Sequence, residues 1–122
     1  GPVREEDIPL TLDAYERHAI VRALDESGGN VQAAADALGL AKSSMYRRMV
    51  LNGIPRPHGF DGQASEFGGY LKLEGPVSLE AYERRAIERA LAEASGSQIG
   101  AAKLLGIGKS TMYRKLRAVG IG

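Results

Sequence analysis

Residues 101–116 read AAKLLGIGKSTMYRKL, and residues 34–49 read AADALGLAKSSMYRRM. In each stretch a pair of alanines precedes a Leu-Gly, a Lys-Ser follows that glycine after two residues, and a Met-Tyr-Arg run comes next. A glycine behind an apolar helical pattern is typical of a helix C-terminus, because glycine adopts the left-handed conformation without steric cost. Each stretch therefore predicts a short helix, a tight turn at Gly39 or Gly106, and a second helix that begins near the lysine. This order is that of a helix-turn-helix.

The two stretches belong to a longer internal repeat. Residues 9–54 align without a gap on residues 76–121, and 24 of the 46 aligned pairs are identical. Two copies are too few for a solenoid, which needs about three or more. The sequence instead predicts a tail at 1–8, a first helix-turn-helix repeat at 9–54, a connector at 55–75 and a second helix-turn-helix repeat at 76–122.

Each repeat also predicts a helix in front of its helix-turn-helix. Thr11 and Ser78 are N-cap residues, and apolar residues follow them at i, i+3, i+4 spacing. Asn30 and Ser97 are suitable N-caps for the next helix. The expected helices cover 12–27, Asn30 to Leu38 and about Lys42 or Ser43 to Gly53 in the first repeat, and 79–94, Ser97 to Leu105 and about Lys109 or Ser110 to Gly120 in the second. Met45, Met49, Met112 and Leu116 are expected on the buried face of the third helices. The fold class that follows is all-α, with two three-helix units.

The connector at 55–75 carries Pro55, Pro57 and five glycines, which interrupt any helical pattern. Its apolar residues are Phe60, Phe67, Tyr70, Leu71 and Leu73. They predict that the connector packs against one or both repeats, with a short extended piece at Tyr70–Leu73.

Charge is segregated along the chain. Sixteen Lys and Arg against fifteen Asp and Glu give a net charge of +1. Residues 37–60 and 94–122 nevertheless hold nine of the basic residues and no acidic one, so the remainder carries −8. This asymmetry is typical of a nucleic-acid-binding protein whose other face is acidic. The alternative is that Lys and Arg collect near helix C-termini, where the helix dipole favours them.

Composition excludes several classes of protein. The chain has no cysteine, and His18 and His58 are isolated, so neither a thiolate site nor a histidine-centred metal site is expected. No apolar run has the roughly 20 residues that span a bilayer, and the acidic residues 5–7 do not suit a signal peptide. Residues 106–111 resemble the end of a phosphate-binding loop, but Lys103 stands where that loop needs glycine. We expect a soluble protein of a reducing compartment that has no cofactor and is not an enzyme.

The residues of the two helix-turn-helix stretches also resemble those of a known family. The pattern resembles the Fis-type helix-turn-helix, which closes many bacterial enhancer-binding activators of the NtrC kind, acting with sigma-54 polymerase. The first copy carries it in Ala34-Ala35, Leu38-Gly39-Leu40, Ser44-Met45-Tyr46-Arg47 and Gly53-Ile54, and the second in Ala101-Ala102, Leu105-Gly106-Ile107, Ser110 to Leu116 and Gly120-Ile121. The resemblance implies sequence-specific binding of double-stranded DNA in bacterial transcription regulation, in the cytoplasm at the nucleoid. The ATPase domain of those activators is not in this sequence, so we expect either a C-terminal part of one or a small stand-alone regulator.

The resemblance also implies which residues touch DNA. The residues that open the third helix would contact bases: Lys42, Ser43, Lys109 and Ser110. The phosphate contacts would come from Asn30, Gln32, Ser44, Tyr46, Arg47, Arg48, Ser97, Thr111, Tyr113, Arg114 and Lys115. The two tyrosines either reach the DNA backbone or only cover the helix. Gln32 corresponds to Ile99, and the second copy has Arg117 where the first has Val50, so we expect the two halves to contribute unequally.

The duplication suggests that the repeats pair with each other. A unit of about 45 residues buries little surface by itself, and Fis-type modules dimerise chiefly through the first helix. We expect the helices at 12–27 and 79–94 to pair through their shared AYER segments in an in-chain pseudo-dimer, with recognition helices about 34 Å apart on an imperfect inverted repeat. The alternatives are two separate units or a homodimer of chains. His18 corresponds to Arg85, so no special role is expected for it.

Other partners and a second class of function stay open. The acidic surface outside the two basic stretches suits RNA polymerase or another regulator as a partner, and no membrane is expected. The alternative function is a protein–protein assembly module, or a coactivator-like adaptor, that has kept the fold and lost DNA binding.

Overall fold

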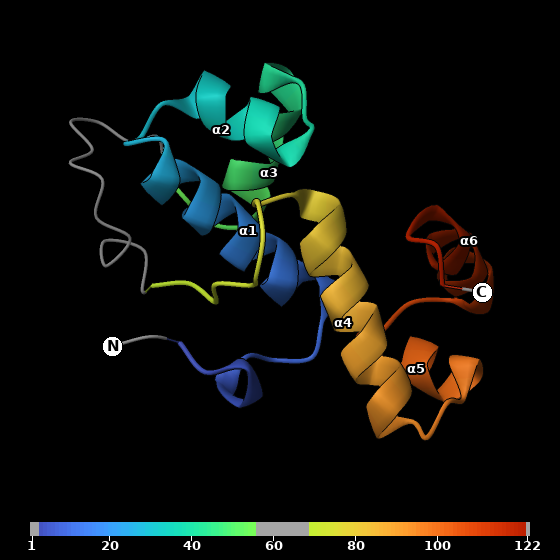
Figure 1. Ribbon diagram of the computed structural model, residues 1–122. Helices are drawn as coiled ribbons and strands as arrows, with labels where there is room; N and C mark the ends of the chain where they lie inside the picture. Colours follow the sequence, from blue (N-terminus) through green and yellow to red (C-terminus); the bar gives the residue numbers. More distant parts are fainter. Residues whose placement is uncertain (1–2, 56–68, 122) are drawn as a thin grey trace.

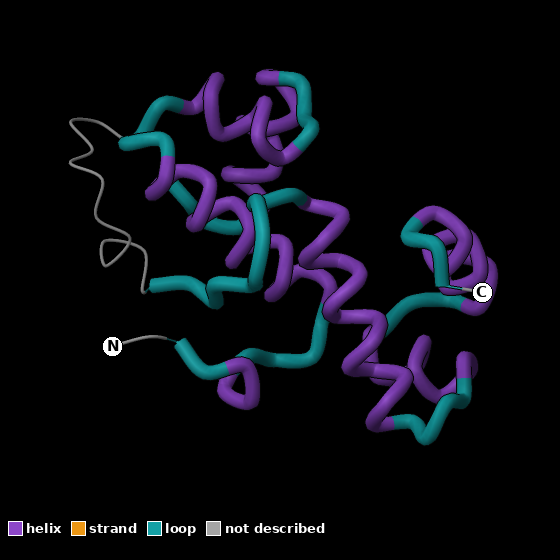
Figure 2. Tube along the Cα trace, viewed as in Figure 1, coloured by secondary structure: helices purple, strands orange, loops and turns teal. Residues whose placement is uncertain are grey.

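The computed structural model describes residues 3–55 and 69–121, which form helices and loops without a β-strand (Figures 1 and 2). The elements are a 3₁₀ turn, η1 (Glu5–Asp7), and the helices α1 (Leu12–Glu26), α2 (Val31–Leu38), α3 (Lys42–Leu51), α4 (Leu79–Glu93), α5 (Gln98–Leu105) and α6 (Lys109–Ala118). The prediction of an all-α fold with two three-helix units is confirmed. His58, Phe60 and Phe67 lie outside the described residues.

Local sequence signals set the helix boundaries. The side-chain oxygens of Thr11, Ser78, Asn30 and Ser97 each accept a hydrogen bond, at 3.0–3.1 Å, from the amide three residues further along. These bonds confirm all four predicted N-caps. Gly39 and Gly106 end α2 and α5 with φ of 76° and 70°. Glycine suits both positions because the left-handed conformation is strained for other residues.

Each unit closes around a small core beneath its helix-turn-helix. The paired alanines of α2 and α5 are buried, and their small size allows the neighbouring helices to approach closely. Met45 and Met49 fill the core from α3, and Met112 and Leu116 fill it from α6, all with exposures of 3% or less. The expected inner faces of the third helices are therefore confirmed.

The two units meet through α1 and α4, which cross at the centre of the molecule. In Figure 1, α2 and α3 lie at one end of this helix pair and α5 and α6 lie at the other. Tyr15 and Ala19 of α1, and Tyr82 and Ala86 of α4, have no exposed surface. The expected in-chain pseudo-dimer is confirmed. Among the described residues, no helix combines the length and apolar character needed to cross a membrane.

Candidate nucleic-acid interface

Helix α3, the predicted recognition helix of the first unit, is fastened to α1 at its C-terminal end. Arg48 of α3 forms an ion pair with Glu16 of α1, and the other carboxylate oxygen of Glu16 accepts a hydrogen bond from the Asn52 side chain at 2.9 Å. Arg17, the next residue of α1, donates to the Asn52 carbonyl oxygen. Since that carbonyl belongs to the C-cap of α3, the arginine satisfies a group that the helix itself leaves open.

Helix α6 is fastened to α4 through the equivalent positions. Lys115 pairs with Glu83 at 3.2 Å, and Arg84 donates to the Val119 carbonyl oxygen at 2.8 Å. The second unit has a valine where the first has Asn52, so Glu83 receives no amide hydrogen bond of the kind that Glu16 receives. Helix α6 is therefore held on α4 by fewer of these contacts than hold α3 on α1.

These contacts give the two AYER segments a second role. The sequence predicts only a pairing surface there, and the buried tyrosines fulfil that role. The glutamate and arginine that follow each tyrosine instead hold the recognition helix of their own unit. The signal was present in the sequence, since both residues recur in both copies, but their partners lie 32 to 36 positions away.

The predicted base-contacting residues lie in solvent at the start of each recognition helix. Lys42 and Ser43 of α3 are exposed, as are Lys109 and Ser110 of α6. The N-caps of these helices are an alanine and a glycine without a side-chain cap hydrogen bond, so the first-turn amides have no side-chain acceptor. Exposed amides and cations at a helix N-terminus suit an anionic ligand.

The predicted phosphate-contacting residues fall into three groups. Arg47, Arg114 and Tyr113 are exposed on the outer faces of α3 and α6, while Ser44, Tyr46 and Thr111 are half-buried. Asn30 and Ser97 cap the preceding helices, and the exposed Gln32 donates to Asp36 at 2.9 Å. Arg48 and Lys115 form the third group, because each faces a glutamate of its own unit.

Both recognition helices border one pocket between the two units. This pocket, of about 300 Å³, is lined by symmetry-equivalent residues of the two units, namely Leu12 and Leu79, Glu16 and Glu83, and Arg48 and Lys115, together with Asp13. Arg48 of α3 and Lys115 of α6 therefore border the same pocket at the junction of the two units.

Two clamps hold the segments that precede the repeats. The first clamp is Arg22 of α1 with Tyr82 of α4: Arg22 donates to the carbonyl oxygens of Leu73 and Gly75 at 3.0 and 2.7 Å, and Tyr82 donates to that of Leu71. Arg22 also lies 3.4 Å from the Tyr82 hydroxyl. Residues 71–75 of the connector are therefore bound across the helix of the other repeat. The predicted packing of the connector is confirmed for this described part, and Tyr70–Leu73 forms no strand.

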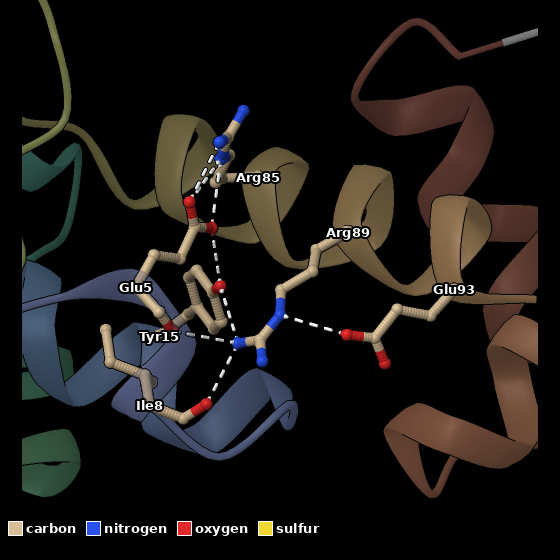
Figure 3. Close-up of polar contacts among 6 residues, drawn as sticks. All are labelled: Glu5, Ile8, Tyr15, Arg85, Arg89 and Glu93. Atoms are coloured by element: carbon tan, nitrogen blue, oxygen red, sulfur yellow. Dashed lines mark hydrogen bonds and ion pairs between the residues drawn. The ribbon is translucent and has the colours of Figure 1, made fainter.

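The second clamp is Arg89 of α4 with Tyr15 of α1 (Figure 3). Arg89 donates to the carbonyl oxygens of Glu5 and Ile8 at 3.2 and 2.9 Å, and to the Tyr15 hydroxyl at 3.2 Å. Tyr15 donates to the Glu5 carboxylate at 2.7 Å. Burial, and next the hydrogen bond to Glu5, raise the pKa of Tyr15 to about 12, so the hydroxyl stays protonated even in moderately alkaline solution. Residues 5–8 are thus held by the second repeat before the chain enters the first.

His18 and Arg85 occupy equivalent positions and complete the two clamps. The His18 Nδ1 atom accepts the Leu71 amide at 2.8 Å, whereas Arg85 binds the Glu5 carboxylate through contacts of 2.8 to 3.1 Å. Burial, followed by the charge of Arg17, lowers the pKa of His18, which favours the neutral form that accepts this bond. His18 therefore has a structural contact that the sequence did not predict, although no functional role follows from it. Its partner belongs to the connector, 53 positions away, so comparison of the repeats alone gave no sign of it.

Two helix-turn-helix units, paired through their first helices, define the class of dimeric helix-turn-helix DNA-binding modules, here within one chain. The family model described as "Bacterial regulatory protein, Fis family" matches residues 11–50 and 78–118, and the chain belongs to this family of DNA-binding regulators. The propane 2-monooxygenase operon transcriptional activator MimR of Mycolicibacterium goodii is 49% identical over 43 residues, which cover 35% of this chain. This match spans 7% of the length of that activator. No solved structure gives a significant match.

Proposed function

We propose that the chain binds a pseudo-palindromic site on double-stranded DNA and regulates transcription, with α3 and α6 in adjacent major grooves. The observation that supports this proposal is the pocket between the two units, because both recognition helices contribute a residue to its lining. Modules of this geometry bind half-sites about 34 Å apart, one helical turn of DNA.

In this proposal the helix N-termini read bases and their surroundings bind phosphates. Lys42 and Lys109 donate to guanine O6 or N7, with Ser43 and Ser110 beside them. Phosphates are bound by Arg47 and Arg114, by the neighbouring polar residues Asn30, Gln32, Ser44, Tyr46, Ser97, Thr111 and Tyr113, and by amides at the starts of the helices.

Arg48 and Lys115, which the family resemblance implies as phosphate contacts, receive a positioning role instead. Each is half-buried and bound to a glutamate of its own unit. A cation already neutralised in this way releases few counterions when DNA binds, so its contribution to affinity is indirect. These two side chains fix the angle at which α3 and α6 approach the grooves.

Fluorescence anisotropy with labelled genomic fragments tests the proposal. Binding is expected to weaken with salt, with a slope of about −0.9 for each phosphate neutralised. Lys109→Ala is expected to relax base preference at one position by about 1–3 kcal/mol, while Arg114→Ala weakens binding to all sequences to a similar degree. Circular dichroism of both variants checks that the fold is intact, since both side chains are exposed.

The absence of salt-dependent binding to any fragment would instead favour the protein-assembly alternative. Molecular mass in solution tests the proposed monomer, and a homodimer would require four reading heads in one particle. A location at the bacterial nucleoid, and contact of the acidic surface with RNA polymerase or another regulator, are parts of the same proposal.

A further inference from the structure

The two recognition helices carry equivalent stripes of side chains that differ at one position. Four side chains at i, i+3, i+4 and i+7 form a single stripe on each helix. The stripe of α3 is Ser43, Tyr46, Arg47 and Val50, and the stripe of α6 is Ser110, Tyr113, Arg114 and Arg117. The first three positions carry the same residues, so the difference lies at the C-terminal end of the stripe, where valine corresponds to arginine.

Val50 is unusually exposed for an apolar side chain. It is 78% exposed, and the neighbouring Leu51 is 75% exposed, the highest values among the large apolar side chains of the described residues. The equivalent residues of α6 are Arg117 and Ala118. The apolar pair therefore extends the surface that carries Arg47, and only the first unit has it.

Charge on the preceding helices differs in the same direction. α5 presents the exposed Lys103 where α2 presents the exposed Asp36, which accepts the hydrogen bond from Gln32. The second unit thus adds two exposed cations, Lys103 and Arg117, to the lysine and arginine that both recognition helices share. The first unit adds an acid and an apolar pair instead.

We propose that the two units read unequal half-sites: α6 binds its half chiefly through phosphate charge, and Val50 with Leu51 makes apolar contact with thymine methyl groups in the half bound by α3. This inference rests on the proposed DNA binding. The C5-methyl of thymine is the apolar group that a base presents in the major groove, and an aliphatic side chain is its natural partner.

The length of the helix allows this contact. Val50 lies eight residues beyond Lys42, which corresponds to about 12 Å along the helix axis. At 3.4 Å per step of one DNA strand, that distance covers about three to four base pairs. A helix whose N-terminus reads bases can therefore bring this side chain to the same groove. Arg117 occupies the corresponding place on α6, where its charge suits a phosphate or a guanine.

Selection from a pool of random-sequence duplexes, followed by anisotropy titrations over salt, tests the proposal with the full chain. The wild type is expected to select two unequal half-sites. Replacing the contacted thymine by uracil in the half-site bound by α3 is expected to weaken binding about fivefold, the equivalent of about 1 kcal/mol. Val50→Arg removes this sensitivity to the methyl group and steepens the salt slope by about 0.9, whereas Arg117→Val makes the slope shallower by about 0.9.

Leu51→Ala is the matched control, because it gives α3 the residue that α6 has. It is expected to reduce the sensitivity to the methyl group and to leave the salt slope unchanged. If the wild type binds DNA but selects equal half-sites, or if uracil weakens neither half, the inference is overturned while the proposed function stands, and the apolar pair is then open to a protein partner. If the wild type binds no DNA, the proposed function and this inference fail together.

Discussion

The two clamps use the same residues to hold different segments. Arg22 with Tyr82 and Arg89 with Tyr15 are related by the 67-residue offset of the repeats, and in both pairs the arginine binds backbone carbonyl oxygens. The arginine of the first clamp is more deeply buried, because the Arg22 side chain is 4% exposed and that of Arg89 is 20% exposed. The same arginine–tyrosine pair therefore binds two segments of different sequence, residues 5–8 and 71–75.

The residue beside each clamp shows how the adaptation works. Arg85 binds the carboxylate of Glu5, and the offset places Lys72 at the position equivalent to Glu5. A pairing of two second repeats would bring Arg85 close to Lys72, a contact between like charges. His18 accepts a hydrogen bond from a backbone amide, so its contact does not depend on the charge of the side chain opposite it. The two repeats are thus complementary to each other and are not interchangeable.

The largest effect is expected from removing the arginine of the buried clamp. Arg22→Ala leaves two carbonyl oxygens and the Tyr82 hydroxyl without this donor, and three polar groups left unsatisfied together cost about 3–5 kcal/mol. Arg89→Ala is expected to cost about 1–2 kcal/mol, because the Arg89 side chain is 20% exposed and its removal vacates less buried space. Urea denaturation followed by circular dichroism measures both free energies of unfolding.

Two further variants sharpen this test. Lys103→Ala removes an exposed cation outside the clamps and is expected to change stability by less than about 0.5 kcal/mol. Arg22→Lys keeps the charge but loses the forked geometry, so it is expected to recover only part of the loss. Equal losses for Arg22→Ala and Arg89→Ala would show that burial does not distinguish the clamps.

An intermediate effect is expected where the recognition helices are fastened. Glu16→Ala releases both Arg48 and Asn52, whereas Glu83→Ala releases only Lys115. We expect losses of about 1–2 kcal/mol for Glu16→Ala and less than about 1 kcal/mol for Glu83→Ala. Thermal unfolding measures the losses, and the reverse order would contradict the inferred difference between the two units.

The smallest effect concerns pH. The unfolded chain protonates His18 at its ordinary pKa of 6.5, while the folded protein protonates it only at lower pH. The unfolded state therefore binds more protons in this interval, and stability falls as the pH drops below 6.5. Loss of the single hydrogen bond to Leu71 is expected to cost less than about 1 kcal/mol.

Glu5 responds in a lower range of pH. The hydrogen bond from Arg85 lowers the pKa of the Glu5 carboxyl, so its contribution is complete above 4.5 and is lost as the pH falls through the lowered value. Between pH 6.5 and 5 the hydrogen bond of His18 with Leu71 is expected to weaken, whereas the contact of Glu5 with Arg85 is not. Melting temperatures of the wild type and His18→Gln across this range are expected to converge as the pH falls, and parallel curves would argue against a role for His18.

Local features of the sequence were enough to predict the elements of the fold. Thr11, Asn30, Ser78 and Ser97 mark helix starts because a capping side chain acts within three residues of itself. The duplication likewise predicts a pair of equivalent units, and the resemblance to Fis-type modules implies which helices join them. The exposure of Lys42 and Lys109 in the candidate site can also be predicted locally, since both lysines precede the buried faces of their helices.

Contacts between distant segments required the tertiary structure. Arg22 reaches Gly75 across 53 positions, and Arg89 reaches Glu5 across 84, because α1 and α4 cross and carry each segment onto the helix of the other repeat. No spacing in the sequence encodes that crossing. The sequence by itself determined two helix-turn-helix units, through local capping, turns and periodicity. Only the packing of α1 on α4 decided that each repeat holds the segment leading into the other, because the crossing brings backbone carbonyls of each segment within hydrogen-bond reach of an arginine from the opposite unit.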